Sequence, residues 1–203
     1  MICGLYTVDE GQILVNGINL NDINKNIFNQ NISVLFQDFL KYEMTLKENV
    51  VLDQTATSND AEIYDALRLA DVNFLQNEDQ TKFHLDVQLG NWFDDGVQLS
   101  GGQWQKIALA RAYYRQASLY LLDEPSSALD ASAEINIFRT FYNMSNEKIG
   151  IFITHKVNAA KKADKIIVLD KGEIVSIGSD LTLSKQCPVY SELKSKENYV
   201  YEG

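Results

Sequence analysis

The sequence predicts an α/β fold with a parallel β-sheet, and two kinds of observation lead to this prediction. First, short apolar runs, typical of strands that are covered on both faces, occur at residues 32–36, 119–122, 149–154 and 166–169. Second, stretches with apolar residues three or four positions apart lie between the later runs, as in amphipathic helices. Alternating strands and helices favour a parallel sheet whose strands are joined by crossover helices.

The size and composition favour one domain that has no nucleic-acid partner. A chain of 203 residues is long enough for one core and too short for two independent domains. Its formal net charge of −10 argues against nucleic acid, whose phosphates need clustered lysine and arginine, and against docking on anionic lipid. The two cysteines, Cys3 and Cys187, are expected to be reduced cytosolic thiols. No apolar run reaches about 18 residues and no leader is present, so we expect no direct membrane insertion.

Local signals divide the first fifty residues into short elements. Asn16-Gly17 predicts a hairpin turn between two short β runs within residues 12–20. The apolar run 32–36 is bounded by polar residues and is expected to be a buried strand. Thr45 is expected to cap a helix, and Glu48, three residues later, would complete a capping box.

The middle of the chain is expected to be mainly helical, from about residue 40 to residue 110. One helix is predicted to begin at residues 58–60 and another to span residues 100–115. Between them, residues 83–98 are rich in glycine and aspartate and are expected to be irregular. The residues of these two helices that should face the core are Ile63, Ala66, Leu67, Ala70, Trp104, Ile107, Ala108 and Ala112.

The last hundred residues alternate between strand and helix patterns. The expected elements are buried strands at 119–122, 149–154 and 166–169, a helix at 131–144, and a turn at 170–172 that leads into a strand at 173–177. The helix should bury Ile137, Phe138, Phe141 and Tyr142. One or two terminal helices should follow residue 179.

A glycine-containing segment, Leu99-Ser100-Gly101-Gly102-Gln103, opens the predicted helix at residues 100–115. Backbone N–H groups at the start of a helix bind anions, and glycines allow an anion to approach the backbone closely. The structural alternative is an ordinary helix cap, in which Ser100 caps the helix after a glycine turn.

Two carboxylates, Asp123 and Glu124, follow the apolar run 119–122 and precede Pro125. Carboxylates at the end of a strand are suited to holding Mg²⁺ and to activating water beside a nucleotide. The structural alternative is a solvated acidic turn, but the four apolar residues before it make this alternative poor.

These two segments, in this order, resemble the nucleotide-binding domain of ATP-binding cassette (ABC) ATPases. Residues 126–130 (Ser-Ser-Ala-Leu-Asp) and the helical sequence 103–112 match the same family. The resemblance covers essentially the whole chain and implies a P-loop NTPase-like parallel-sheet core with a helical subdomain. Residues 90–96 and the full Ser-Ser-Ala-Leu-Asp look most like exporter-type cassettes, including bacterial peptide and lantibiotic exporters.

The resemblance implies a role for each polar residue near the ends of the strands. Asp123 would hold Mg²⁺, and Glu124 would polarise the water that attacks ATP. His155 matches the switch histidine, which contacts the γ-phosphate, and Gln37 matches the Q-loop glutamine, a ligand of Mg²⁺ and water. By itself, a histidine at a strand end is most often structural, and a glutamine after a strand has no specific meaning.

The resemblance also implies that the ATP sites form between two cassettes paired head to tail. The signature residues Ser100, Gly101, Gly102 and Gln103 would close over the γ-phosphate of ATP that the other cassette holds, and Asp130 in the D-loop would cross the interface. Asp130 is also placed to cap the following helix.

A transmembrane domain or subunit of an exporter is the second partner that the resemblance implies. It would dock on residues 39–49, although these residues also suit ordinary packing of the helical insert. The chain would then be cytoplasmic and peripheral, held at the inner face of the membrane by this partner.

By the same resemblance, residues 1–203 form a single, partial nucleotide-binding domain with four parts. These parts are a remnant of the core at 1–39, a helical subdomain at 40–115, a core portion with Walker B and the switch histidine at 116–178, and a tail at 179–203.

The phosphate-binding motif G-x-x-x-x-G-K-[ST] does not occur in the sequence. In related cassettes it lies just ahead of the segment that matches residues 2–6. We therefore expect an N-terminally truncated cassette that lacks the N-terminal strands and begins inside the helix after the phosphate loop. The strands at 149–154 and 166–169 would then have unpaired edges and uncovered apolar faces.

The expected function is that of the ATP-binding, ATP-hydrolysing part of an ABC exporter, unable to hydrolyse ATP alone. Two alternatives remain open. The chain could be a non-catalytic module that completes the ATP site of an intact partner cassette in trans, or an inert gene remnant.

Overall fold

The structure, a computed structural model, describes residues 1–52, 58–125 and 131–201. It divides into two compact units, Met1–Phe152 and Ile153–Gly203. The strands are β1 (Leu14–Val15), β2 (Ile18–Asn19), β3 (Ile32–Leu35), β4 (Leu119–Asp123), β5 (Ile149–Ile153), β6 (Ile166–Asp170) and β7 (Glu173–Gly178). The α-helices are α1 (Lys25–Asn31), α2 (Leu46–Val51), α3 (Asp60–Leu69), α4 (Gly101–Tyr114), α5 (Ala131–Met144), α6 (Val157–Ala160), α7 (Asp180–Gln186) and α8 (Pro188–Tyr201). Two short 3₁₀ helices are η1 (Leu20–Asp22) and η2 (Asn73–Leu75).

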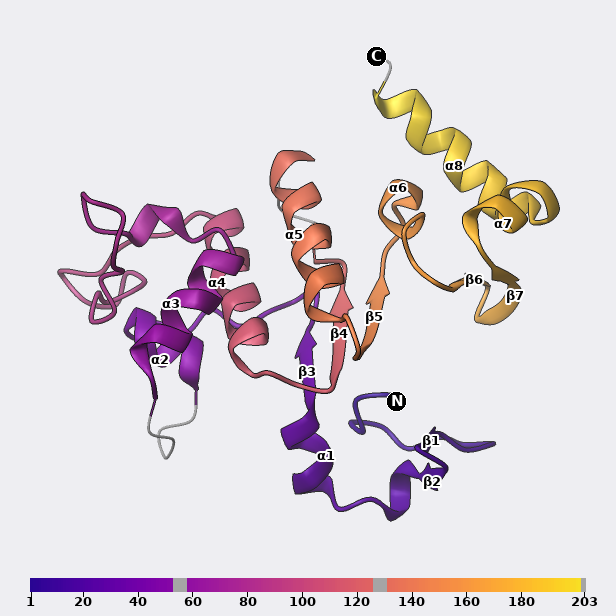
Figure 1. The fold of residues 1–203 in the computed structure, drawn as a ribbon, viewed down its shortest axis with the longest axis horizontal. Helices are drawn as coiled ribbons and strands as arrows, with labels where there is room; N and C mark the ends of the chain where they lie inside the picture. Colours follow the sequence, from indigo (N-terminus) through magenta and orange to yellow (C-terminus); the bar gives the residue numbers. More distant parts are fainter. Residues whose placement is uncertain (53–57, 126–130, 202–203) are drawn as a thin grey trace. The chain divides into compact units, whose positions relative to one another are not determined.

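The first unit contains a three-stranded sheet in the order β3-β4-β5 (Figure 1). Strands β3 and β4 are parallel, with Ile32 paired to Leu119 and Leu35 paired to Leu122. This pairing joins segments that are far apart in the sequence, with the helices α2, α3 and α4 between them. The predicted α/β class with a parallel sheet is confirmed.

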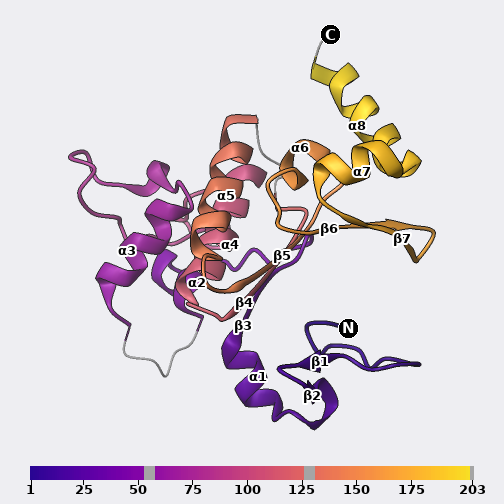
Figure 2. The same cartoon turned by 45° about the vertical axis from the view of Figure 1, so that its right-hand side comes forward.

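Helices α2, α3 and α4 lie side by side in this unit (Figures 1 and 2). Their apolar faces share one core with β3, β4 and α5, and every residue of α3 and α4 predicted to face the core is buried. Helix α4 is also tied to the sheet, because Ser33 Oγ on β3 donates a hydrogen bond to the carbonyl of Ala112 (2.8 Å). The predicted boundaries of the helical subdomain remain a prediction.

The short-range signals in the first fifty residues are confirmed. Asn16 and Gly17 have φ angles of 51° and 81°, the left-handed pair that a two-residue hairpin turn requires, and they join β1 to β2. Thr45 and Glu48 form the predicted capping box at the start of α2. Glu48 Oε2 accepts hydrogen bonds from the Thr45 hydroxyl (2.8 Å) and from the Thr45 N–H (2.9 Å), and both lower the pKa of Glu48.

The predicted burial of the strand at 149–154 is wrong. Ile149 and Ile153 in β5 are 59% and 49% exposed. Among the described strands, β5 has only β4 as a neighbour, so one edge is unpaired. This agrees with the expected uncovered faces.

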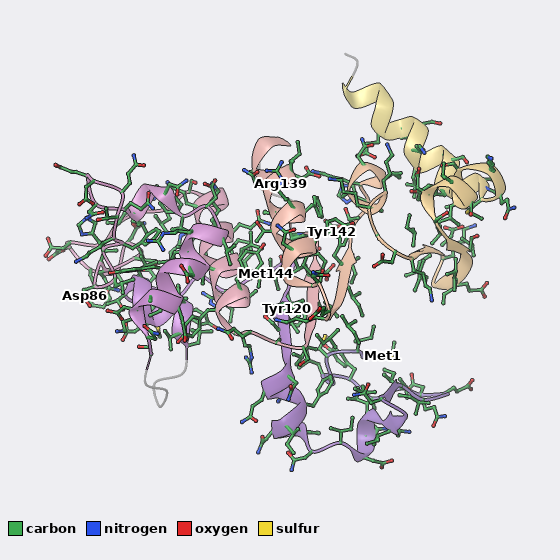
Figure 3. All side chains as sticks on the ribbon, in the orientation of Figure 1. Met1, Asp86, Tyr120, Arg139, Tyr142 and Met144 are labelled. Atoms are coloured by element: carbon green, nitrogen blue, oxygen red, sulfur yellow. The ribbon has the colours of Figure 1, made fainter. Side chains whose placement is uncertain are left out.

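Three smaller expectations also fail. The strand at 166–169 was expected to be buried, but Ile167 and Leu169 in β6 are 52% and 64% exposed. On α5, Ile137, Phe138 and Phe141 are buried as predicted, but Tyr142, which Figure 3 labels, is only half-buried. Residues 1–6 form a turn instead of the expected helical segment, with the Gly4 N–H donating to the Met1 carbonyl (2.8 Å) and Gly4 at φ 73°. The left-handed conformation of Gly4 interrupts any right-handed helix in this segment.

The second unit is built on the antiparallel hairpin β6–β7, which turns at Lys171 and Gly172 as predicted. Helices α6, α7 and α8 belong to the same unit, and Ser179 caps α7. The residues of its small core are Val157, Ile166, Val168, Leu183, Cys187 and Tyr190.

Candidate functional site

The carboxyl ends of β3 and β4 lie at the same edge of the sheet, because the two strands are parallel and in register. Asp123 is the last residue of β4, and Glu124 follows it. Gln37 is exposed and lies two residues beyond the end of β3. The structure therefore brings three predicted site residues to one edge, the edge at which open α/β sheets bind ligands.

Asp123 and Glu124 place two carboxylates side by side in a half-buried position. Burial raises the pKa of Asp123, and the charge of Glu124 raises it further. A bound cation would act in the opposite direction, because a positive charge nearby favours the ionised carboxylate.

The donors at this edge suit Mg²⁺, which binds one or two carboxylates together with substrate phosphates and waters. Asp123 supplies a carboxylate, and Gln37 supplies an amide oxygen at the same edge. In the described part of the chain, no group of three or more His, Cys, Asp and Glu side chains is arranged to hold a metal ion.

The turn after β4 has an uncommon backbone. Glu124 has a φ of 45°, in the left-handed region that residues other than glycine rarely adopt. The next residue, Pro125, is buried, and its carbonyl accepts a hydrogen bond from Gln105 Nε2 (2.8 Å). Gln105 lies on α4 and is 1% exposed.

Sequence reasoning did not single out Gln105. The signal that could have found it is a long polar side chain among the core positions of an otherwise apolar helix face, because a buried amide needs a hydrogen-bond partner.

The signature segment forms a capping box at the start of α4. Ser100 Oγ accepts a hydrogen bond from the Gln103 N–H (3.2 Å), and Gln103 Oε1 accepts one from the Ser100 N–H (2.8 Å). The structural alternative, a helix cap at Ser100, is therefore confirmed as part of the local structure. It does not exclude a ligand, because the Ser100 hydroxyl proton remains available for donation.

The helix start is also sterically open. A Cβ atom added at Gly101 would meet no atom within 4 Å, so packing within the chain gives no reason for glycine there. The N–H groups of Gly101 and Gly102 are at the helix start, where no intrahelical carbonyl is available to them. These groups and the Ser100 hydroxyl are hydrogen-bond donors, the kind of group that binds anions at helix N-termini.

The other two predicted site residues are not among the described residues of the first unit. His155 is exposed and belongs to the second unit, two residues after β5 ends. Near it, the Lys156 N–H donates to Thr154 Oγ1 (3.0 Å). Asp130, with the rest of the expected D-loop at 126–130, lies outside the described residues.

The segment predicted to dock a membrane partner contacts the loop that precedes the signature. Glu43 Oε2 accepts hydrogen bonds from the N–H groups of Asn91 (2.9 Å) and Trp92 (2.7 Å). The Trp92 side chain is 85% exposed, and Leu40 is 63% exposed. Apolar side chains therefore face solvent on both connected segments.

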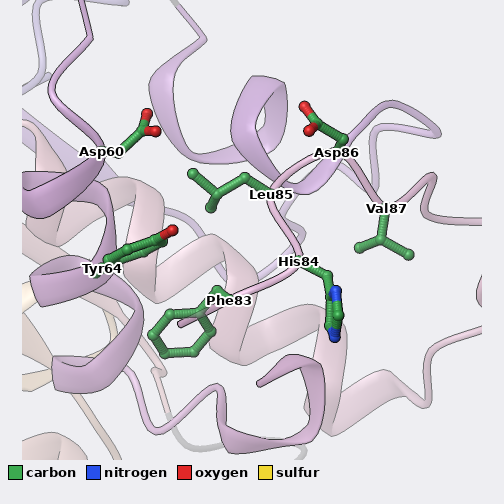
Figure 4. A pocket seen from close by; sticks show the side chains of 7 residues that line it. All are labelled: Asp60, Tyr64, Phe83, His84, Leu85, Asp86 and Val87. Carbon is green, nitrogen blue, oxygen red and sulfur yellow. The ribbon is translucent and has the colours of Figure 1, made fainter. Parts of the chain in front are cut away.

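A pocket of about 420 Å³ lies elsewhere in the first unit. Figure 4 shows its lining, in which Asp60 and Tyr64 from α3 face residues 83–87. The rings of Tyr64 and Phe83 are 5.6 Å apart. None of the predicted site residues lines this pocket.

Comparison with known proteins finds a family and close relatives. The family described as ABC transporter matches residues 1–127. The subtilin transport ATP-binding protein SpaT of Bacillus subtilis is 53% identical in an alignment 203 positions long, which covers 98% of this chain and 32% of that protein. The nisin transport ATP-binding protein NisT of Lactococcus lactis subsp. lactis is 46% identical over 200 residues, which cover 98% of this chain and 33% of that protein.

A solved structure of a bacterial Atm1-family ABC exporter with ATP bound is similar to this chain, with a TM-score of 0.85 and 26% identity. The match covers 97% of this chain and 34% of the exporter chain. The chain thus spans about a third of the length of the proteins that it matches. Among the described helices, none combines the length and the apolar character needed to cross a membrane.

Proposed function

Because the chain belongs to the ABC transporter family, we propose that it is the ATP-binding part of an exporter, where ATP binding and hydrolysis drive transport across a membrane. The observation that carries this proposal is the shared edge of β3 and β4, at which Gln37, Asp123 and Glu124 meet. The named relatives, which transport subtilin and nisin, favour a peptide as the exported substrate.

Each residue at this edge then has a task in ATP hydrolysis. Asp123 and Gln37 would hold Mg²⁺, which would neutralise charge on the phosphates. Glu124 accepts a hydrogen bond from the attacking water and orients it. For His155, in the second unit, contact with the γ-phosphate is proposed from the match to the switch histidine alone.

The signature residues act on ATP that a second cassette holds. Ser100, Gly101, Gly102 and Gln103 offer the open helix start of α4 to its γ-phosphate, in a head-to-tail dimer in which Asp130 also lies at the interface. Support comes from the accessible N-terminus of α4 and its remaining donors. The exposed side chains on residues 39–49 suit contact with a transmembrane partner, which holds the cassette at the inner face of the membrane.

We further propose that a polypeptide of these 203 residues does not hydrolyse ATP alone, since it contains no G-x-x-x-x-G-K-[ST]. A second candidate function is a module that completes the site of an intact cassette without turnover of its own. The open helix start favours this function equally.

The test is Mg²⁺-dependent ATP hydrolysis by the purified chain and by its Glu124→Gln variant, each alone and mixed with an intact cassette that carries G-x-x-x-x-G-K-[ST]. Alone, the two proteins should not differ. In the mixture, the chain should raise the rate of hydrolysis. Turnover by the chain alone that Glu124→Gln removes would contradict the proposed lack of autonomous activity, and no effect on the intact cassette would contradict the role in trans.

A further inference from the structure

We propose that Gln105 is a positioning residue that ties the signature segment, Ser100–Gln103, to the turn that carries Glu124. The proposal rests on the proposed function and names a residue that links its two halves. Its basis is the hydrogen bond from Gln105 Nε2 to the Pro125 carbonyl (2.8 Å). This bond joins α4 to a turn 20 residues further along the chain.

The hydrogen bond between Gln105 and Pro125 is shielded from water. Gln105 is 1% exposed, and Pro125 is buried as well. A buried amide that loses its acceptor is not compensated by water, so the side chain and the Pro125 carbonyl hold each other in place.

The turn needs an external contact because its own backbone is unfavourable. Glu124 occupies the left-handed region at φ 45°, and the following proline further restricts its conformation. Such conformations persist where the surroundings determine them. Gln105 supplies one such contact to the residue next to Glu124, so it fixes the direction from which the Glu124 side chain leaves the backbone.

Helix α4, on the other side of this hydrogen bond, is also held in place by hydrogen bonds. Gln105 is on the first turns of α4, directly after the capping box of Ser100 and Gln103. Further along α4, Ser33 Oγ holds the Ala112 carbonyl. The helix is therefore attached to the sheet through β3 and through the turn after β4. A displacement of the turn should therefore move the signature end of α4. A displacement of that end of α4 should likewise move the turn.

In the proposed dimer these two ends serve different nucleotides. Glu124 belongs to the site of its own chain, whereas Ser100 faces the ATP of the other cassette. Gln105 thus links two segments whose proposed roles are at different nucleotides.

The first test is hydrogen–deuterium exchange of the chain with Gln105→Met, which keeps the length of the side chain but removes the donor. Exchange in the peptide 119–125 and at the start of α4 should rise about two- to tenfold, the loss expected for one hydrogen bond. Gln30→Met, the same change at an exposed position on α1, should leave both peptides unchanged. If Gln105→Met does not fold, Gln105→Asn replaces it, since this variant keeps the amide but is too short to reach Pro125.

The second test is the maximal stimulation of an intact partner cassette by the chain. Gln105→Met should lower this maximal stimulation about tenfold, because the signature residues would be misplaced, and should leave the KM for ATP within about twofold. Asn59→Ala removes the side-chain cap of α3, outside the site and the proposed docking segment, and serves as the control for lost stability alone.

The outcomes separate the two proposals. Faster exchange together with weaker stimulation supports a positioning role for Gln105. Unchanged exchange, or unchanged stimulation by a folded variant, would overturn it. If the unmodified chain gives no stimulation, the proposed function in trans fails, and the exchange experiment by itself then decides whether Gln105 holds the turn.

Discussion

Arg111 donates two hydrogen bonds to Asn49, a residue 62 positions earlier in the chain. Arg111 Nε donates to the Asn49 carbonyl (2.9 Å), and Nη2 donates to Asn49 Oδ1 (3.1 Å). Asn49 Nδ2 in turn donates to the carbonyl of Tyr42 (2.9 Å), whose ring lies 4.6 Å from the Arg111 guanidinium carbon. This network ties the segment after Gln37 to α4, the helix that begins with the signature.

The network predicts a large loss of stability when Arg111 is replaced by methionine. Burial lowers the pKa of Arg111, and its hydrogen bonds to Asn49 compensate for part of the lost hydration. Arg111→Met leaves the polar groups of the fully buried Asn49 without these donors, and the free energy of unfolding should fall by about 2–3 kcal/mol. Urea denaturation measures this change. Arg139→Met, at an exposed position on α5, is the control and should change little; an equal effect of the two variants would contradict the role of the network.

A gain of stability is expected at Tyr113. Its side chain is buried, and its hydroxyl has no hydrogen-bond partner among the described residues. Burial also raises the pKa of this hydroxyl, so it stays protonated. Tyr113→Phe should raise the free energy of unfolding by about 1 kcal/mol, because an unsatisfied polar group is removed. Tyr6→Phe, at a residue 75% exposed, is the matched control. A destabilised Tyr113→Phe would mean that the hydroxyl has a partner.

The carboxylate of Asp180 should make a pH-dependent contribution to the stability of the second unit. Burial alone would raise the pKa of Asp180, but the ion pair with Lys194 (3.0 Å) and the hydrogen bond from Tyr190 (2.9 Å) outweigh it and hold the pKa below its usual range. A carboxylate with a lowered pKa stabilises the fold above its unfolded-state pKa of about 3.9, and this stabilisation is lost as the pH falls through the folded-state value.

Asp180→Asn should therefore cost about 2 kcal/mol at pH 7 and clearly less at pH 3, as measured by denaturation at the two pH values. Glu192→Gln breaks an exposed pair with Lys196 and should have little effect at either pH. A cost for Asp180→Asn that is equal at both pH values would show that the charge of Asp180 is not responsible.

Features set by residues close together in the sequence could be predicted. The hairpin at Asn16-Gly17, the Thr45–Glu48 capping box and the helix cap at Ser100 each depend on neighbours within three positions. The apolar composition of the strands predicted a parallel sheet, but it did not predict that β3 and β4 would be neighbours. The common edge of Gln37, Asp123 and Glu124 therefore comes from the observed pairing, whereas the sequence linked these residues only through the family resemblance.

Contacts between distant residues could not be predicted in the same way. The hydrogen bonds from Gln105 to Pro125 and from Arg111 to Asn49 depend on how α4 is rotated against the sheet and against α2, which packing of the whole unit decides. The exposure of β5 likewise depends on which strands lie beside it, and its apolar sequence alone suggested burial.

The capping boxes at Ser100 and Thr45, both among the described residues, separate the structural role of Ser100 from its role toward a partner. Ser100→Ala and Thr45→Ala each remove a helix cap, and each should lower the free energy of unfolding by about 1 kcal/mol. Only Ser100 is proposed to contact ATP held by another cassette, so thermal denaturation should not distinguish the variants, whereas ATP hydrolysis should.

The most direct measurement is the rate of ATP hydrolysis by an intact partner cassette during titration with the chain. The unmodified chain and Thr45→Ala should both raise this rate, and Ser100→Ala should raise it at least about tenfold less, because a donor to the γ-phosphate is lost. Equal stimulation by Ser100→Ala and the unmodified chain would contradict the claim that the start of α4 completes the ATP site of a second cassette.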